Sequence, residues 1–383
     1  MDNASRPATP APSLPTTTGP RRRWFDLHSW IGLKLCVLMG FTCLTGTLAV
    51  FAQEIDWLLH PPMRVTPGES PVGWDALIAS AQQAHPGWTL NSVSAPHASR
   101  FAAMAVMRTP RDRLRFVWID PYTGRVTGDT HWFSAHRFLR NTHRHLMLPV
   151  KYGVPLVAAL SLPLLLSLAT SLVIYKRWWR GFLQRPRPQR PRRLWGDVHR
   201  LLGVWSLWFI ALIGLTGGWY LVESLGGKAT PPAGIALPHE ASAHAMAEPG
   251  AVRWAMGEVR QRWPQLRIAN LRPNQDGRGL LIEGQAQAWL VRDRANAVGV
   301  DLRQRRVLAL RDGRDMSLHQ RIAEMADPLH FGGFGGWPVR LLWFVFGMAL
   351  TTLCFTGVYL YGLRVSDALR AALRRRDAGK ARR

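Results

Sequence analysis

The chain has 383 residues, of which 47% are apolar and 19% are charged, and its 49 lysines and arginines against 24 acidic residues give a formal net charge of +25. This composition excludes a disordered or collagen-like chain. The mean hydropathy of −0.06 resembles that of a soluble protein. The average hides a strong segregation, however, because the apolar stretches and the basic residues occupy different parts of the chain.

Four stretches carry no charged residue over a length close to the roughly 20 residues that a helix needs to cross a ~30 Å hydrocarbon core. They are Leu35–Ala52, Val154–Tyr175, Leu201–Val222 and Leu341–Leu363. The first stretch is the shortest, but it extends back to Leu27 with only Lys34 as an interruption, and a lysine near a helix end can reach the interface. The sequence therefore predicts a membrane α-helical protein with four transmembrane helices, at 24–53, 150–176, 195–223 and 337–364.

Positive charge beside the spans predicts the orientation, because short cytoplasmic flanks retain lysine and arginine. Residues 1–23 carry four basic residues, 176–193 carry eight with no acid, and 364–383 carry eight. Both termini are therefore expected in the cytoplasm. We interpret the net charge as a topology signal and an attraction to the anionic lipid membrane, and we expect no nucleic acid partner.

These assignments divide the rest of the chain. Residues 1–23 are expected as a disordered cytoplasmic tail, 177–194 as a basic cytoplasmic loop and 365–383 as a basic cytoplasmic tail. The segments 54–149 and 224–336 then lie outside, and each includes the approach to the next span. Short alternating runs between glycine, proline and aspartate, such as Leu114–Ile119 and Trp289–Val291, predict strands. Each outside segment is therefore expected to be a small α+β lobe that begins with an amphipathic helix.

The sequence repeats at a fixed offset of 171 residues, which indicates an internal duplication. The shared pattern is W-x-D-x-H-x3-G, followed further on by L-T-G. It pairs Trp24, Asp26, His28, Gly32 and 44–46 with Trp195, Asp197, His199, Gly203 and 215–217. Each copy of the repeated unit contains a helix, an external lobe and a second helix.

His28 and His199 hold equivalent positions at the cytoplasmic start of a span, where a histidine is costly enough to suggest a function. A two-fold arrangement would direct both imidazoles at one gap, as bis-histidine ligation of a haem iron requires. Gly32 and Gly203, one turn later, would leave room for the flat macrocycle. The alternative is that the glycines are helix contacts and the histidines interfacial hydrogen-bonding groups. We expect Asp26 and Asp197 to cap the helices.

The outside ends of spans two and four carry a second pair of histidines. His143 and His330 each lie 11 residues before an uncharged stretch. A membrane thickness of about 30 Å separates them from the first pair, so the sequence predicts two b-type haems, one near each face. His145 and His136 are the alternatives to His143 as a ligand of the outer haem.

Several of these motifs together resemble the PepSY-associated transmembrane family, and within it the FoxB-type ferric-siderophore reductases of bacterial inner membranes. The motifs are W-x-D-x-H-x3-G at 195–203, F-L-R at 138–140 with H-R at 143–144, Y-K-R at 175–177 and L-H-F-G at 329–332. The resemblance implies a di-haem b protein in the bacterial inner membrane, with two PepSY-like periplasmic lobes. It assigns the ligand roles to His28, His143, His199 and His330.

The predicted function is the reduction of ferric siderophore iron to Fe(II) in the periplasm, with either a quinol or a cytoplasmic reductase as the electron donor. Arg137 and Arg140 would form part of a basic surface that attracts an oxygen-rich chelate, unless they bind haem propionates or lipid headgroups instead. The alternative function is that of a non-enzymatic membrane sensor or regulator whose external lobes bind a peptide or protein. In that case the histidines would be structural or would hold a metal.

Overall fold

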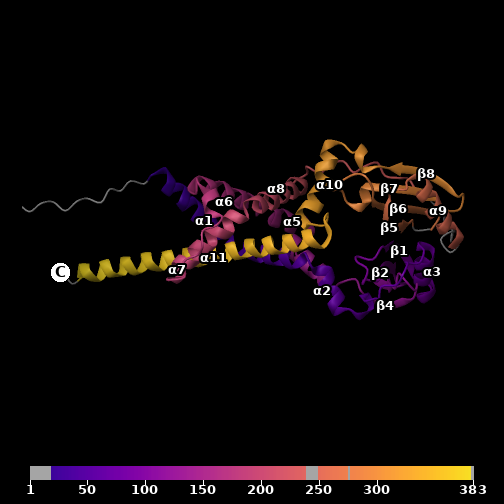
Figure 1. Ribbon diagram of the computed structural model, residues 1–383, viewed down its shortest axis with the longest axis horizontal. Coiled ribbons are helices and arrows are strands. Elements are labelled where there is room, and N and C mark those ends of the chain that lie inside the picture. Colours follow the sequence, from indigo (N-terminus) through magenta and orange to yellow (C-terminus); the bar gives the residue numbers. More distant parts are fainter. Residues whose placement is uncertain (1–18, 239–248, 275–276, 381–383) are drawn as a thin grey trace, which may run out of the picture.

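The computed structural model describes residues 19–238, 249–274 and 277–380. Figure 1 shows an elongated molecule in which a bundle of helices carries a single large β-sheet at one end. The beginning of the first helix and the end of the last helix lie at the opposite end. Most of the expected tail, residues 1–18, lies outside the described residues.

The bundle is built from the apolar segments of the sequence. Its helices are α1 (Pro20–Ala49), α5 (Val150–Ala158), α6 (Ser161–Ile174), α7 (Pro191–Trp205), α8 (Leu207–Ser224) and α11 (Gly336–Lys380). Within the described residues, Val150–Ile174, Leu207–Ser224 and Gly336–Ala378 are long and apolar enough to cross a membrane. The two halves of α1 meet at a bend of 62° between Ile31 and Cys36, and they add a fourth span if they are counted together.

Two of these features have a local cause or an unexpected extent. α5 and α6 are separated at Ala159 and Leu160, four and three residues before Pro163, because a proline ring clashes with the carbonyl four residues earlier. α11 does not end with the apolar stretch. Residues 365–380, which were expected as a basic tail, continue it as one helix that extends beyond the bundle in Figure 1.

The helices of the two repeats alternate in the bundle. α1 packs against α6 and α11, α8 packs against α5 and α6, and α7 packs against α11. Small residues permit close approach: an added Cβ at Gly347 would lie 2.5 Å from Thr47 Oγ1, and one at Gly214 would lie 2.6 Å from Leu165 Cδ2. Each repeat therefore supplies helices to both sides of the contacts that bring the histidines together.

The external segments form one sheet rather than two separate lobes. Eight antiparallel strands follow the order β4-β3-β2-β1-β5-β6-β7-β8. Their bounds are β1 Thr89–Ser94, β2 Ala103–Arg108, β3 Leu114–Ile119, β4 Val126–His131, β5 Arg267–Pro273, β6 Gly279–Gln285, β7 Asn296–Asp301 and β8 Arg306–Arg311. Trp289–Val291, which was expected as a strand, lies in a loop.

The two halves of the sheet join where β1 pairs with β5. Val93 lies opposite Leu271 and Ser94 lies opposite Asn270. Each half alone would expose the backbone groups of this strand as an unpaired edge, and the pairing satisfies both edges at once. We therefore correct the prediction of two independent lobes. A lobe-by-lobe reading of the sequence cannot find this contact because it joins residues 176 to 178 positions apart.

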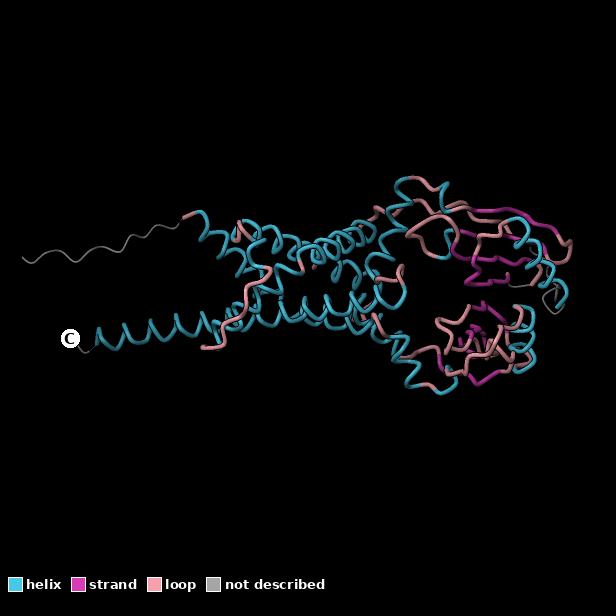
Figure 2. Tube along the Cα trace, viewed as in Figure 1, coloured by secondary structure: helices cyan, strands magenta, loops and turns pink. Residues whose placement is uncertain are grey.

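One face of the sheet is covered by α3 (Trp74–Ala84) and α9 (Pro249–Arg262), which also pack on each other. Arg253 on α9 donates to Asp75 on α3 at 2.8 Å. The side chains beneath them form a single core that crosses the β1–β5 junction and contains Val93, Leu271 and Ile282, all fully buried. In Figures 1 and 2 these helices lie at the end of the molecule farthest from the bundle. The other face of the sheet is therefore directed towards the bundle.

Three short helices join the sheet to the bundle: α2 (Ala52–Leu59), α4 (Ala135–His145) and α10 (Leu318–Phe331). Ser134 caps α4 by accepting from the Arg137 backbone N–H, and Ser317 forms a capping box with Gln320 at the start of α10. α4 packs on α1 and α5, and α10 packs on α8. The histidine-bearing approaches to the second and last spans are thus fixed helices.

An ion-pair network connects the last span to the sheet end of the molecule. Arg340 on α11 donates to both carboxylate oxygens of Glu54 on α2 at 2.6 Å and contacts His97 Nε2 at 2.8 Å. Burial by itself raises the pKa of Glu54, but the hydrogen bonds from His97 and Arg340 outweigh it and lower the pKa to about 2. The carboxylate is therefore fully ionised at neutral pH.

We predict that Glu54→Gln lowers the thermal midpoint at pH 7, because the lost charged hydrogen bonds are worth about 1–3 kcal/mol. Since the pKa of Glu54 is depressed in the folded state, its contribution is complete above the ordinary value near 4.5 and disappears as pH falls towards 2. The difference between variant and wild type should shrink over that range. The exposed Glu69, for which the structure records no ion pair, provides the control Glu69→Gln. A constant difference down to pH 3 would contradict the assignment.

Candidate functional site

The outer histidine pair lies where the sheet end meets the bundle. His143 on α4 and His330 on α10 approach each other with ring centres 6.0 Å apart and ring planes inclined by 39°. Burial lowers the pKa of His143, and it lowers that of His330 to about 3. Both rings are therefore neutral at physiological pH, which leaves one nitrogen of each free to bind a metal.

The inner pair is formed by His28 on α1 and His199 on α7, whose imidazoles are close enough to interact electrostatically. The two pairs are far apart along the bundle. His143 packs against Gly46 of α1, and at 1.5 Å per residue the helix rises about 27 Å between His28 and Gly46, less the shortening caused by its bend. The duplicated histidines thus meet as two separate pairs.

All four histidines are held in the same way, by a hydrogen bond from Nδ1 to an oxygen atom of a neighbouring helix. The acceptors and distances are Thr170 Oγ1 at 2.9 Å for His28, Thr356 Oγ1 at 2.8 Å for His199, Thr216 Oγ1 at 2.8 Å for His330 and the Thr42 carbonyl at 2.9 Å for His143. Each bond crosses from one helix to another.

These partners determine where the ring proton lies. The hydroxyls of Thr170, Thr216 and Thr356 donate to carbonyl oxygens of their own helices, three and four residues earlier. Each hydroxyl oxygen can then only accept, so the histidine Nδ1 must carry the proton. The same follows for His143, because a carbonyl is only an acceptor. Within the described residues the structure records no hydrogen bond to Nε2 of any of the four, and this nitrogen carries the lone pair.

The threonines were missed in the sequence, although a signal for them exists. Thr216 belongs to the repeated L-T-G, but its hydroxyl reaches His330 on another helix rather than a residue nearby in the chain. Thr170 and Thr356 are 186 residues apart, and His143 and His330 are 187 apart. A search for repeats among the second and fourth spans would have paired both sets, whereas the offset of 171 applies only to the first and third spans.

The glycines expected beside the inner pair are not those that the structure presses against histidine. An added Cβ at Gly46 would lie 2.6 Å from His143 Cε1, whereas one at Gly203 would have Leu353 at 3.9 Å as its nearest neighbour. The surroundings of Gly32 lie outside the described residues. Gly357 on α11 approaches the inner pair, because its Cβ would lie 3.7 Å from His199 Cε1.

His145 and His136 occupy different surroundings from His143. His145 is buried with no hydrogen-bond partner at Nδ1, and its carbonyl and Cβ pack against Gly153. The backbone N–H of His136 donates to Asp56 at 3.2 Å, and burial lowers the pKa of its imidazole. Of the three, His143 is the one whose ring faces His330. No group of three or more histidine, cysteine or acidic side chains that could hold a metal is present among the described residues.

The two arginines predicted to meet the substrate lie on different sides of α4. The guanidinium of Arg137 stacks on the Trp132 ring at 3.3 Å from its centre, and its Nε has no hydrogen-bond partner. Arg140 is close enough to Asp327 and Tyr220 to interact with them electrostatically. The ring of Tyr220 meets that of His330 edge-on at 5.3 Å, so Arg140 lies nearer to the outer histidine pair.

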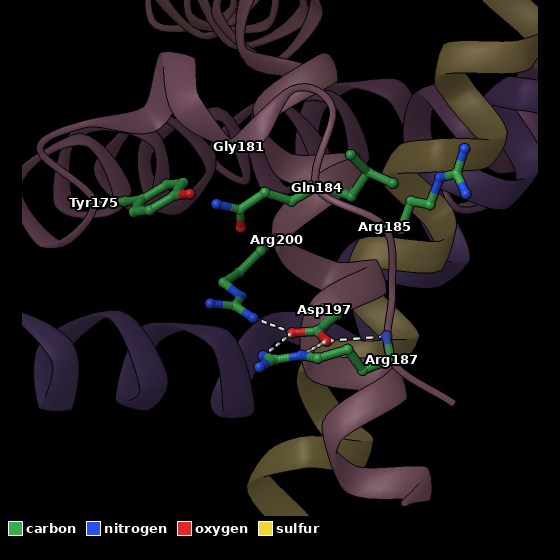
Figure 3. A pocket seen from close by; sticks show the side chains of 8 residues that line it. Tyr175, Gly181, Gln184, Arg185, Arg187, Asp197 and Arg200 are labelled. Carbon is green, nitrogen blue, oxygen red and sulfur yellow. Dashed lines mark hydrogen bonds and ion pairs between the residues drawn. The ribbon is translucent and has the colours of Figure 1, made fainter. Parts of the chain in front are cut away.

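The helix-capping role expected of Asp26 and Asp197 is wrong, because both lie inside helices that begin at Pro20 and Pro191. Asp26 instead accepts from Arg364 at 2.9 Å. Asp197 accepts from Arg200 and from Arg187, whose Nε lies at 2.9 Å. Figure 3 shows the two arginines approaching the Asp197 carboxylate from different sides, beside a cavity of about 320 Å³. Asp197 thus fixes the basic loop against α7.

The family model of the PepSY-associated TM region matches residues 25–364, which include all four of these histidines and the whole sheet. The chain belongs to the PepSY-associated transmembrane family. As a family member it is a membrane protein, and the family is associated with haem-binding, oxidoreductase-like membrane proteins. A search of the curated proteins finds no match for this PepSY-associated protein.

We predict that Gly46→Ala lowers the thermal midpoint of this PepSY-associated protein, because the new methyl group would overlap the His143 ring and overpacking costs about 1–3 kcal/mol. Gly218→Ala in α8 is the matched control, since its Cβ would have only Ser161 Oγ at 3.8 Å as a neighbour. Differential scanning fluorimetry of both variants checks the prediction. Equal midpoints for the two variants would show that the His143 ring moves aside without cost.

Proposed function

We propose that the protein is a ferric-chelate reductase that holds two b-type haems, one between His28 and His199 and one between His143 and His330. The observation that carries the proposal is the common state of the four histidines. Each donates through Nδ1 to a helix oxygen and keeps the lone pair on Nε2, the arrangement in which a second hydrogen bond orients and tunes a metal-binding imidazole.

The residues present fit a haem at the outer pair. Metal–imidazole nitrogen bonds are about 2 Å long, so two imidazoles on opposite sides of one metal place their ring centres about 6 Å apart. The observed separation of His143 and His330 is 6.0 Å. Bound haem supplies a reversible one-electron Fe(III)/Fe(II) couple. The protein contributes the neutral rings, the threonine and carbonyl acceptors that orient them, and the surrounding low-polarity helices.

The proposed reaction reduces Fe(III) held by a siderophore to Fe(II), at the cost of one electron from the donor for each iron. No bond forms between the protein and the chelate. Oxygen-rich chelators hold Fe(II) more weakly than Fe(III), so the reduced iron can leave. The positions of the histidine pairs towards opposite ends of the bundle support electron delivery across the membrane, from a quinol or a cytoplasmic reductase. We place the protein in the bacterial inner membrane, with the sheet in the periplasm and both termini in the cytoplasm.

We predict that His199→Ala or His28→Ala removes one haem, and that His330→Ala or His143→Ala removes the other, because each pair shares one site. Haem-to-protein stoichiometry, by pyridine haemochrome absorption of the purified protein, should fall from two to one in each single variant. His145→Ala is the control within the same helix as His143. Loss of a haem in His145→Ala but not in His143→Ala would make His145 the ligand and overturn our assignment.

A second prediction concerns the threonines that orient the rings. Thr216→Val retains the side-chain shape but removes the acceptor of His330 Nδ1–H, so the affinity of the outer site for haem should fall about 10- to 100-fold. Thr351→Val in α11 is the matched control, because its buried hydroxyl bonds only to the carbonyl of its own helix at Gly347. Haem titration of the apoprotein measures both affinities. Equal affinities for both variants and wild type would remove the proposed role of Thr216.

Ferric reduction itself is tested in sealed vesicles with a reduced quinol or a cytoplasmic reductase on the side of the termini. A ferric trihydroxamate and a ferrous-specific chromogenic trap are placed on the side of the sheet. We expect the coloured ferrous complex to form with the wild type and not with His330→Ala. A colourless, folded wild-type protein that forms no ferrous complex would contradict the proposal and favour a non-enzymatic sensor.

A further inference from the structure

A cavity of about 760 Å³ lies across the junction of β1 and β5, where the two halves of the sheet meet. Ser92 and Ser94 of β1 and Asn270 and Arg272 of β5 line it. Side chains alternate between the faces of a strand, and Val93 and Leu271, which lie between these residues, are buried under α3 and α9. The cavity therefore opens on the uncovered face of the sheet, which is directed towards the bundle (Figure 1).

The chemistry of the cavity wall is polar with an excess of positive charge. Three arginines (Arg272, Arg292 and Arg294) and two acidic residues (Glu283 and Asp293) line it. Glu283 is already engaged, because it accepts from Asn270 Nδ2 at 3.0 Å. Serine and asparagine side chains add neutral hydrogen-bonding groups to the wall. Such a lining suits a ligand that is neutral or anionic and rich in oxygen atoms.

One side of the cavity is aromatic. Trp132 lines it, and the Arg137 guanidinium lies against this indole ring at 3.3 Å. Arg137, which the sequence placed at the substrate, therefore acts one layer behind the wall by holding Trp132 in position. The volume lies within the range of small-molecule sites, about 300–1,000 Å³.

A continuous chain of contacts joins the cavity to the outer histidine pair. Arg292, on the cavity wall, donates to Asp327 Oδ2 at 3.0 Å, and Tyr220 donates its phenol proton to Asp327 Oδ1 at 2.7 Å. The Tyr220 ring then meets His330 at 5.3 Å. Arg292 is also bound to Glu324, one turn of α10 before Asp327. The cavity wall and His330 are thus held by the same helix and the same ion pairs.

We propose that this cavity is the docking site of the substrate, a neutral or anionic Fe(III) chelate with oxygen ligands, and that Arg292 positions the chelate next to the outer histidine pair. The proposal rests on the proposed function, because it identifies where the chelate of that reaction binds. The site requires both repeats, since β1 and β5 each supply half of its floor.

The test uses a gallium(III) trihydroxamate, which has the size and charge of the iron complex but is not reduced, so binding is measured apart from electron transfer. Isothermal titration calorimetry of the full-length protein in detergent should detect saturable binding. Ser92→Trp fills the cavity from its floor and should weaken this binding at least 10-fold. Ala309→Trp, at an exposed position on the edge strand β8, is the matched control and should bind like the wild type.

Arg272→Glu provides a second variant, since its side chain is largely exposed and its replacement does not fill space in the sheet. It should weaken binding of an anionic gallium chelate at least 10-fold and should reduce the salt dependence of binding. Far-ultraviolet circular dichroism and the thermal midpoint verify that each variant is folded. Unchanged binding in both folded variants would overturn the docking site.

The outcomes separate this inference from the proposed function. If wild-type vesicles reduce the iron complex while Ser92→Trp binds the gallium complex normally, reduction occurs at another surface and only the docking site is wrong. If the gallium complex binds in a manner that Ser92→Trp abolishes, but no iron is reduced by the haem-loaded wild type, the docking site stands and the reductase assignment fails.

Discussion

The hydrogen bond from each histidine Nδ1 to an oxygen of another helix is the interaction on which the rest of the site depends. A buried neutral imidazole has two tautomers, and an acceptor that cannot donate selects one of them. In His28, His199 and His330 that acceptor is a threonine hydroxyl whose proton is already given to its own helix. The same bond fixes the ring and connects two helices, so the state of the imidazole and the packing of the bundle are set together.

The sheet applies the same economy at the other end of the molecule. Its central pair, β1 with β5, closes the two edges that each repeat would otherwise expose, and it creates the floor of a polar cavity directed at the bundle. The buried ion pairs of Arg292 with Glu324 and Asp327 then connect that cavity to α10. Because breaking a buried ion pair leaves an uncompensated charge, these contacts favour one orientation of the sheet relative to His330.

The sequence predicted the features that depend on periodicity and repetition. Uncharged stretches gave the membrane helices, and the offset of 171 residues paired His28 with His199. It did not predict Thr170 and Thr356, because a bundle brings side chains together across helices whose spacing in the chain has no fixed value. The union of the lobes was also missed, since edge pairing depends on tertiary placement rather than on local alternation. Asp197 was misread because an aspartate near a span resembles a cap until a distant loop supplies Arg187.

Antiparallel pairing of β1 with its counterpart β5 is the geometry that a two-fold axis generates between identical strands. Each histidine pair likewise takes one member from each repeat. A protein made of one repeat alone would therefore hold no complete pair as a monomer, yet two copies could build both pairs and the full sheet by meeting along that axis. The fold is thus equivalent to a symmetric homodimer whose subunits have become one chain, and fusion would have freed each half to change its side chains independently of the other.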